Sequence, residues 1–239
     1  MSKIKVAMVG GGIGGFIGEI HRAAMRLDDR FELVAGALSS DATRAMESAK
    51  ELGVRGYESW QALLEKEQDT VDCVVIVTPN DSHAEIATAA LEAGYYVILD
   101  KPMTRTLDEA VALAGVAQSN NSGIAMTYTY TGYPMVREMR KRILNGEIGK
   151  VRTVSVDYRQ GWLAEPIEQE GQKQASWRTD PQKSGAGALG DIGSHAEQLA
   201  RFTTGLAIKE VRGDVHTIVK ERKVDDHACV QLKMEHGVV

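Results

Sequence analysis

The sequence is poor in aromatic residues and in cysteine. Aromatic residues make up 5% of the 239 residues, whereas apolar residues make up 43%. A folded core must therefore consist mainly of Ala, Val, Ile and Leu, a composition that suits a parallel sheet covered by helices. The only two cysteines, Cys73 and Cys229, have no metal-type spacing. Cys73 lies in the apolar run 73–77, and we expect it to be buried.

Basic blocks and long apolar segments are also missing. The net charge is −5 at pH 7 and the lysines and arginines are dispersed, which argues against a nucleic-acid-binding surface. No apolar stretch reaches the length of a membrane span, and the first residues contain no signal-peptide core. The sequence therefore predicts a cytoplasmic protein with no nucleic-acid and no membrane partner.

The first half alternates short apolar runs with amphipathic helical patterns. Such alternation is typical of β-α-β units around a parallel sheet. Gly53 and Gly94 follow two of the helical patterns at the position where a glycine ends a helix. We expect strands at 4–9, 31–38, 71–77, 96–99 and 124–127, and helices at 15–27, 43–52, 59–66, 82–93 and 107–119.

The pattern changes near residue 130. From there the sequence predicts an α+β segment with an open, mainly antiparallel sheet. The final residues, from His236 to Val239, look like a turn into another strand, so we expect this second part to be incomplete at its C-terminus. Its expected elements are helices at 135–144 and 194–202, strands at 151–158, 208–219 and 227–234, and a long loop at about 160–187.

Three glycines directly after the first strand form the pattern G-x-G-x-x-G, namely Gly10, Gly12 and Gly15. Gly10 permits a tight turn, Gly12 lets the backbone approach a pyrophosphate, and Gly15 allows close helix–sheet packing. Phosphate would bind the free N–H groups that open the following helix. Since a strand precedes the pattern and a helix follows it, we predict a dinucleotide-binding Rossmann domain at 1–127, with Ile13 in the same loop, and a substrate-binding domain at 128–239.

The end of the second strand lacks the acidic residue that would bind the adenine-ribose hydroxyls of NAD. Ser39, Ser40 and Asp41 stand there, and Arg44 follows. Two hydroxyls and an arginine can accept a 2′-phosphate, so the sequence favours NADP over NAD. Equally, Ser40 or Asp41 can cap the next helix while Arg44 is solvated. The two interpretations are compatible, because a cap residue can still contact ribose.

Three further stretches resemble a known family. Thr78-Pro79-Asn80-Asp81-Ser82-His83 follows the strand expected at 71–77, and Asp100-Lys101-Pro102 follows the strand at 96–99. Downstream, Trp177-Arg178-Thr179-Asp180-Pro181 leads to Gly190-Asp191-Ile192-Gly193-Ser194-His195. In this order they resemble the glucose–fructose oxidoreductase / inositol dehydrogenase (Gfo/Idh/MocA) family over essentially the whole chain. The Lys-Pro pair and the G-D-x-G-x-H segment are the most specific parts.

The resemblance implies hydride exchange between NAD(P) and a sugar, a polyol or a related secondary alcohol. It also implies an open sheet in the second domain that carries substrate and often makes the oligomer, so a homo-oligomer is expected. The lysine of the family's E-K-P motif maps onto Lys101, with Asp100 in place of the glutamate. The aspartate and histidine of its substrate-side motif map onto Asp191 and His195.

The T-P-N stretch, Thr78, Pro79 and Asn80, matches a family segment close to the cofactor. His83 matches as well, and it can serve either the cofactor or the packing of a helix start. Family members commonly carry Asn or Arg after the sixth strand, but this chain has Tyr128 near that point. A tyrosine there changes the pocket wall, so the family does not supply the substrate. Trp177 and Arg178 would contact the substrate or fasten their loop.

In the implied chemistry, His195 accepts the proton, since its unperturbed pKa is about 6.5. Lys101 orients and stabilises the substrate oxygen, and Asp191 orients one or both; taken alone, Asp191 could instead be a helix N-cap. We expect no metal site, because Asp191, His195, His216 and His227 are too scattered for zinc. Two alternatives stay open: a non-catalytic regulator that binds the dinucleotide, and a redox-assisted glycosidase that retains NAD.

Overall fold

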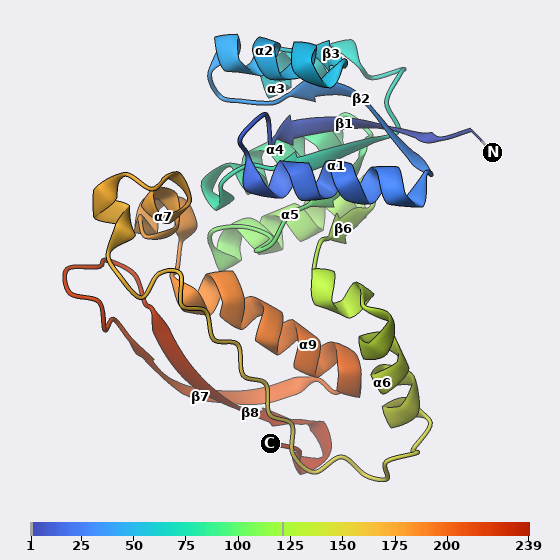
Figure 1. Cartoon of the computed structure of the whole chain (residues 1–239). Helices are drawn as coiled ribbons and strands as arrows, with labels where there is room; N and C mark the ends of the chain where they lie inside the picture. Colours follow the sequence, from blue (N-terminus) through green and yellow to red (C-terminus); the bar gives the residue numbers. More distant parts are fainter. Residues whose placement is uncertain (1, 121) are drawn as a thin grey trace. The chain divides into compact units, whose positions relative to one another are not determined.

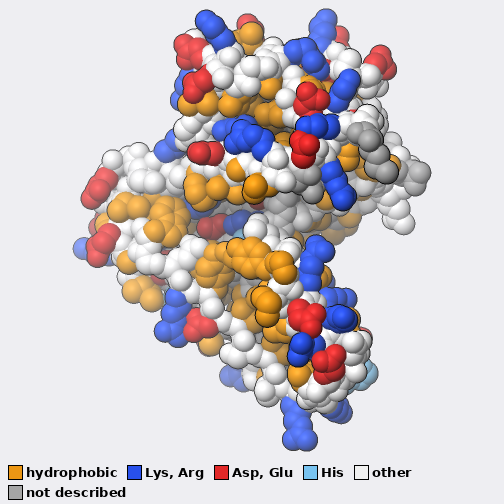
Figure 2. Space-filling view, turned by 45° about the vertical axis from the view of Figure 1, so that its right-hand side comes forward, with side chains coloured by type: hydrophobic (Ala, Val, Ile, Leu, Met, Phe, Trp, Pro, Cys, Tyr) orange, Lys and Arg blue, Asp and Glu red, His pale blue; other side chains and the backbone are white. Residues whose placement is uncertain are grey.

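A computed structural model describes residues 2–120 and 122–239 of the chain (Figure 1). The chain divides into two compact units. Unit 1 ends at Thr127 and unit 2 runs from Tyr128 to Val239. Among the described residues, no helix is long and apolar enough to cross a membrane. On the face that Figure 2 shows, basic and acidic side chains are interspersed, without a continuous basic area.

Unit 1 is built on a six-stranded parallel sheet with the order β3-β2-β1-β4-β5-β6. Each neighbouring pair of strands is parallel. The strand order reverses between β1 and β4, which makes the sheet doubly wound, as the sequence predicts. The strands are β1 Ile4–Gly10, β2 Phe31–Ala37, β3 Arg55–Gly56, β4 Cys73–Val77, β5 Tyr96–Leu99 and β6 Ile124–Met126.

Helices cover both faces of this sheet (Figure 1). Met25 of α1 and Ala49 of α2 pack with one apolar cluster, and Leu63 of α3, Leu91 of α4 and Leu113 of α5 pack with the other. Because both faces are covered, every residue of β4 is buried, which explains its continuous apolar sequence. The helices are α1 Phe16–Asp28, α2 Ala42–Leu52, α3 Trp60–Lys66, α4 His83–Glu92 and α5 Leu107–Ser119, with the 3₁₀ turn η1 Asn80–Ser82.

Unit 2 combines helices with a two-stranded antiparallel sheet of β7 and β8. Its cartoon in Figure 1 shows two long connections, before α7 and between the two strands. Its helices are α6 Pro134–Leu144, α7 Lys173–Arg178, α8 Pro181–Ser184 and α9 Ser194–Thr204, and its strands are β7 Ile208–His216 and β8 His227–Met234. Its shorter turns are η2 Thr129–Gly132, η3 Ile167–Glu170, the π-turn η4 Leu189–Gly193, and η5 Glu235–Gly237.

Two sequence predictions for unit 2 are wrong. Residues 151–158 form no strand; the backbone bonds of this segment join Val154 and Arg152 to Val239, whereas a strand needs a partner along its length. The segment 160–187 is not a plain loop, because it contains η3, α7 and α8. Alternation of apolar and polar residues indicates which side chains are exposed, but it does not show that a second strand is present to pair with.

One strand is shorter than predicted and another was not predicted. The strand expected at 208–219 ends at His216, because the Asp226 carboxylate accepts the N–H groups of Ile218 and Val219 and so turns the backbone away from the ladder. The two-residue strand β3 was not predicted, since it is too short to carry a periodic pattern.

Candidate active site

The glycine loop after β1 folds back onto the end of β2. Gly10 and Gly11 have φ angles of 80° and 67°, a left-handed conformation that favours glycine. The Gly12 N–H donates to the Leu38 carbonyl at 3.0 Å, and a Cβ on Gly12 would lie 2.6 Å from that oxygen. A side chain at position 12 would therefore push the loop away from the sheet.

The start of α1 suits an anion. Gly15 is its N-cap residue and supplies no side-chain hydrogen bond, so the first N–H groups of α1 are available to a phosphate. The tightest helix–loop contact is at Gly18, where a Cβ would overlap the Gly11 carbonyl. The glycine pattern predicts a packing role for Gly15, and Gly18 was not predicted, although its place three residues into a helical pattern is a signal in the sequence. These features fit the pyrophosphate of a dinucleotide.

The segment after β2 contains the candidate cofactor-selecting residues. Asp41 caps α2, since its carboxylate accepts the Arg44 N–H at 2.9 Å, while Ser39 Oγ accepts the Asp41 N–H at 3.1 Å. The Arg44 side chain is exposed and its Nε lies 3.7 Å from Asp41 Oδ1. Ser40 is exposed. The helix cap is therefore Asp41, and the hydroxyls and guanidinium remain on the surface beside it.

The rest of the glycine loop is fastened to α2. The Ile13 N–H donates to Ser48 Oγ at 3.2 Å, whereas the Ile13 side chain is exposed. Ser48 is buried and was not singled out from the sequence, because a serine within a helix carries no local signal for a contact 35 residues away.

The loops after β4 and β5 are joined by a buried histidine. His83 Nε2 lies 2.9 Å from the Thr78 carbonyl, and its Nδ1 lies 2.9 Å from the Pro102 carbonyl. Asn80 is also buried, in η1 directly after the exposed Pro79. His83 thus sits at the start of α4 and ties the T-P-N loop to the loop that contains Lys101.

Lys101 follows β5 and is half-buried. Its backbone N–H donates to Asp100 Oδ1 at 2.9 Å, and the Thr127 hydroxyl donates to the same oxygen at 2.8 Å. The Lys101–Pro102 peptide bond is cis. Because β1, β2, β4 and β5 are parallel, the glycine loop, Ser39, Asn80 and Lys101 all lie at the carboxyl edge of one sheet, where such sheets bind ligands.

In unit 2, His195 lies on α9 and is surrounded by tyrosines. The ring centroids of Tyr130, Tyr128 and Tyr158 lie 4.9, 5.7 and 6.2 Å from the His195 ring, and the Tyr130 and Tyr158 hydroxyls share a hydrogen bond. Burial and this hydrogen bond raise the pKa of Tyr130 to about 12. Tyr130 is therefore a neutral phenol at neutral pH, next to a buried imidazole.

Asp191 lies inside η4, so it is not a helix N-cap. Its Oδ2 lies 3.3 Å from Arg178 Nε. The Arg178 guanidinium also stacks on the Trp177 and Trp162 rings, with its carbon 4.2 and 5.8 Å from the centroids. Trp162 was not anticipated. Arg178 thus holds the Asp191 carboxylate through an ion pair that two indole rings flank.

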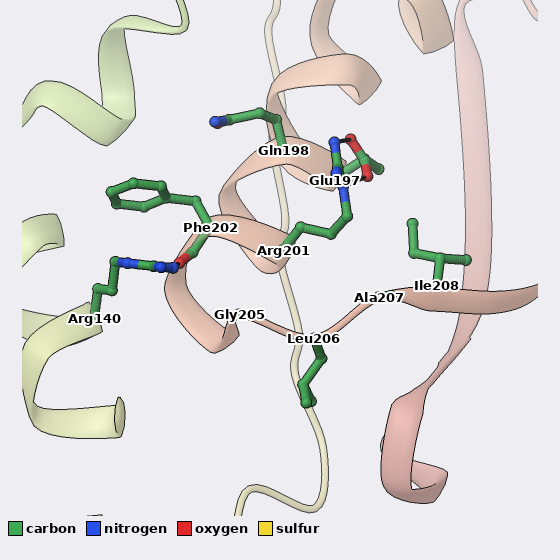
Figure 3. A pocket seen from close by; sticks show the side chains of 9 residues that line it. All are labelled: Arg140, Glu197, Gln198, Arg201, Phe202, Gly205, Leu206, Ala207 and Ile208. Atoms are coloured by element: carbon green, nitrogen blue, oxygen red, sulfur yellow. Dashed lines mark hydrogen bonds and ion pairs between the residues drawn. The ribbon is translucent and has the colours of Figure 1, made fainter. Parts of the chain in front are cut away.

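A cavity of about 690 Å³ lies along the C-terminal half of α9 (Figure 3). Figure 3 shows Arg140 of α6 reaching the Phe202 carbonyl and Arg201 turned to Glu197. Neither Asp191 nor the three tyrosines line it. Because its lining contains none of the residues predicted from the sequence, this cavity is not the candidate site.

Among the described residues, no group of three or more His, Cys, Asp or Glu side chains could hold a metal ion. Two of the four side chains named above as potential zinc ligands contact each other instead. The His216 and His227 rings stack across β7 and β8, with centroids 6.1 Å apart.

Comparison with known proteins assigns both units of the chain to described domain families. Residues 4–128 match the description "Oxidoreductase family, NAD-binding Rossmann fold", and residues 136–239 match "GFO/IDH/MocA C-terminal domain". A crystal structure of an inositol dehydrogenase homolog complexed with NAD⁺ from Azotobacter vinelandii superposes with a TM-score of 0.94 at 37% identity, over 99% of this chain and 63% of that one.

Two relatives extend the comparison. The uncharacterized oxidoreductase YfiI of Bacillus subtilis (strain 168) is 35% identical over 99% of this chain and 63% of its own length. Levoglucosan dehydrogenase of Pseudarthrobacter phenanthrenivorans is 32% identical over 99% of this chain and 60% of its own length. The chain thus spans about three fifths of the length of these relatives, and it belongs to the Gfo/Idh/MocA family of oxidoreductases.

Proposed function

We propose that this chain carries the cofactor-binding and proton-transfer residues of an NAD(P)-dependent dehydrogenase that acts on a CH–OH group of a sugar or polyol. One observation supports this most strongly. A glycine loop, a T-P-N loop and a Lys-Pro pair lie at the carboxyl edge of one sheet. The same chain contains the buried His195, four residues after Asp191. The relatives named levoglucosan dehydrogenase and inositol dehydrogenase homolog support the substrate class.

Each catalytic residue has a separate task in this proposal. When bound, the dinucleotide supplies the acceptor or donor of the hydride. His195 takes the hydroxyl proton, since an imidazole titrates near neutral pH. Lys101 donates a hydrogen bond to the substrate oxygen and stabilises the charge that develops on it. Asp191, held by Arg178 at 3.3 Å, orients the proton acceptor.

The aromatic side chains of unit 2 are proposed to form the wall of the substrate site. The Tyr128 and Tyr130 rings meet the His195 ring in T-shaped arrangements, and tyrosine side chains, which are partly apolar and partly polar, suit the apolar faces and hydroxyls of a sugar. Trp177 and Arg178 stack on each other and serve the site by holding Asp191.

The activity is tested by following NAD(P)H absorbance with a panel of sugars and polyols. We expect Lys101→Met and His195→Ala each to lower kcat by roughly 10²–10⁴-fold, while the Kd for the dinucleotide changes by less than about threefold. Dinucleotide binding with no turnover of any alcohol would favour a regulator. Release of sugar with retained cofactor would favour a glycosidase.

For the cofactor, we propose a preference for NADP, in which Ser39, Ser40 and Arg44 receive the 2′-phosphate. The Arg44 guanidinium is exposed and forms a surface pair with Asp41 at 3.7 Å, so a phosphate can compete for it. Titration with both dinucleotides should show tighter binding of NADP, and Arg44→Ala should narrow the difference by about 1–2 kcal/mol. Equal Kd values in the unmodified protein would refute this preference.

We also propose that the protein forms a homo-oligomer through the β7–β8 sheet. Val211, Val215 and Val230 are exposed on its two strands, and an open sheet edge favours pairing with another chain. Sedimentation of the purified protein at micromolar concentration tests this, and a monomer would refute it.

A further inference from the structure

The helix that carries Asp191 and His195 is capped by a distant residue. The helical backbone is continuous from residue 188 through η4 to the end of α9. Its first N–H groups have no partner within the helix, as at every helix start. The side chain and the backbone of Asp225, in the connection between β7 and β8, supply those partners.

Asp225 binds three consecutive N–H groups. Its Oδ1 accepts from the Gly187 N–H at 2.7 Å, and its Oδ2 accepts from the Leu189 N–H at 2.6 Å. Its backbone carbonyl accepts from the Ala188 N–H at 2.9 Å. A carboxylate at this end of a helix is also favoured by the helix dipole. The cap therefore fixes the position of the first helical turn along the helix axis and its rotation about that axis.

That first turn leads directly to the proposed catalytic groups. The Gly187 carbonyl accepts the Asp191 N–H at 2.9 Å, one turn further along, and His195 follows one turn later. A Cβ on Gly187 would overlap the Asp225 carbonyl, so a glycine at 187 is required for the contact. The cap and the catalytic aspartate are thus separated by a single hydrogen-bonded turn.

The segment that bears Asp225 is itself braced. The buried Arg222 side chain donates to both Glu168 oxygens at 2.9 and 3.0 Å and to the Leu163 carbonyl at 2.8 Å. The neighbouring Asp226 accepts the Ile218 and Val219 N–H groups. The segment that carries Asp225 is therefore held in place by the hydrogen bonds of Arg222 and Asp226.

We propose that Asp225 is a positioning residue for the reaction: it sets the placement of Asp191 and His195 through the helix start. This inference rests on the proposed function, because it assigns these two residues a role in the chemistry. A 1 Å displacement of a catalytic group can cost about 10²-fold in rate, so a residue that does not touch the substrate can still control kcat.

The experiment compares Asp225→Asn with its neighbour Asp226→Asn in the full chain. Both variants remove one negative charge, and both replace a carboxylate that accepts two backbone N–H groups. Asp226 also pairs with the buried Arg222 at 3.3 Å, so we expect Asp225→Asn to lower the melting temperature by about 2–6 °C and Asp226→Asn to lower it at least as much. Only Asp225→Asn should lower kcat, by about 10–100-fold, with the dinucleotide Kd unchanged, at a temperature where both variants are folded.

A second readout does not depend on turnover. The six histidines of the chain are labelled at Cε1, and the His195 NMR signal is identified by its loss in His195→Gln. Because tyrosine rings surround His195, ring currents make its chemical shift sensitive to its position. We expect Asp225→Asn and Gly187→Ala to move the His195 signal, and Asp226→Asn to leave it in place.

The two readouts separate the two proposals. An unmoved His195 signal in Asp225→Asn overturns the positioning role, whether or not the protein turns over an alcohol. If kcat falls equally in Asp225→Asn and Asp226→Asn in proportion to lost stability, the role is also overturned. A moved signal in a protein without any dehydrogenase activity supports the helix cap and refutes the proposed function instead.

Discussion

The two units are stabilised in different ways. Both large apolar clusters lie in unit 1, where each residue of β4 is buried between helices. In unit 2, β7 and β8 expose most of their residues, and the buried apolar residues described there are Ala175, Ala200, Val224, Met234 and Val238. Its distant segments are joined by charged side chains that bind backbone groups. Unit 1 is thus held by apolar burial, and unit 2 depends on a few polar contacts.

The largest effect should come from the polar centre of unit 2. Arg222→Met leaves the Glu168 and Asp226 carboxylates, each with a mostly buried side chain, without their cation. We expect a loss of about 3–5 kcal/mol in the stability of unit 2. Hydrogen exchange of peptides around residues 163–168 and 218–226 measures it.

Arg201→Met is the matched control for this prediction. Arg201 is also an arginine of unit 2, but it is exposed and pairs with Glu197 on its own helix. We expect a change below about 1 kcal/mol. Equal losses of stability in Arg222→Met and Arg201→Met would show that the buried ion pairs stabilise unit 2 no more than an exposed pair does.

A smaller effect tests the apolar side of the comparison with one substitution in both units. Val75→Ala removes two methyl groups from the centre of β4, where the side chain is fully buried, and should cost about 2–3 kcal/mol. On the exposed strand β8, Val230→Ala should cost less than about 0.5 kcal/mol at a protein concentration where the chain is monomeric. Hydrogen exchange in each unit gives both values, and a similar cost at Val230 would mean that the β8 face is covered in solution.

The smallest effect tests the main polar network of unit 1. Glu67 is buried and accepts hydrogen bonds from Arg55 at 2.6 and 2.7 Å and from the Tyr57 hydroxyl at 2.7 Å. The hydrogen bonds from Arg55 lower the Glu67 pKa from 4.5 to about 2. Since the folded pKa lies below the unfolded one, the contribution is complete above about pH 4.5 and is lost as the pH falls towards 2.

Lowering the pH from 6 to 3 should therefore reduce the free energy of unfolding of the unmodified protein by about 1–2 kcal/mol more than it reduces that of Glu67→Gln. This range allows for solvent screening at the half-exposed Arg55. Urea unfolding followed by Trp60 fluorescence measures this, with Trp162 and Trp177 replaced by Phe. Trp60 lies on α3, which ends beside Glu67. The same acid sensitivity in Glu67→Gln would assign the effect to other carboxylates.

The contrast also explains what the sequence predicts well. In unit 1, β1 and β4 carry long buried apolar runs and helices pack apolar side chains on the sheet, so periodicity and caps locate every α-helix and strand except β3 within one or two residues. β5 and α5 have the predicted bounds. The glycine pattern and the Lys-Pro pair are local, and their places at strand ends follow from the alternation of strands and helices.

Several of the features that were missed involve partners far apart in the sequence. Asp225 binds residues 36 and 38 positions earlier, and Arg222 binds Glu168 across 54 residues. Neither contact produces a periodic pattern in the sequence, and an aspartate or arginine in a turn is ordinarily expected to be exposed to solvent. The alternating segment 151–158 misled the prediction for the same reason: a strand depends on a distant partner, which local pattern does not specify.

The cap on the helix of Asp191 and His195 has a consequence for biosynthesis. A nascent chain emerges from the ribosome in order, and domains fold as they emerge. The helix from residue 188 is synthesised before Asp225 exists, and short helices without tertiary contacts are marginal in water. Unit 1 can complete its sheet at Thr127, whereas the His195 helix gains its cap only after about a further hundred residues have been translated. During translation, the sheet edge that carries the glycine loop should therefore form before the helix that carries Asp191 and His195.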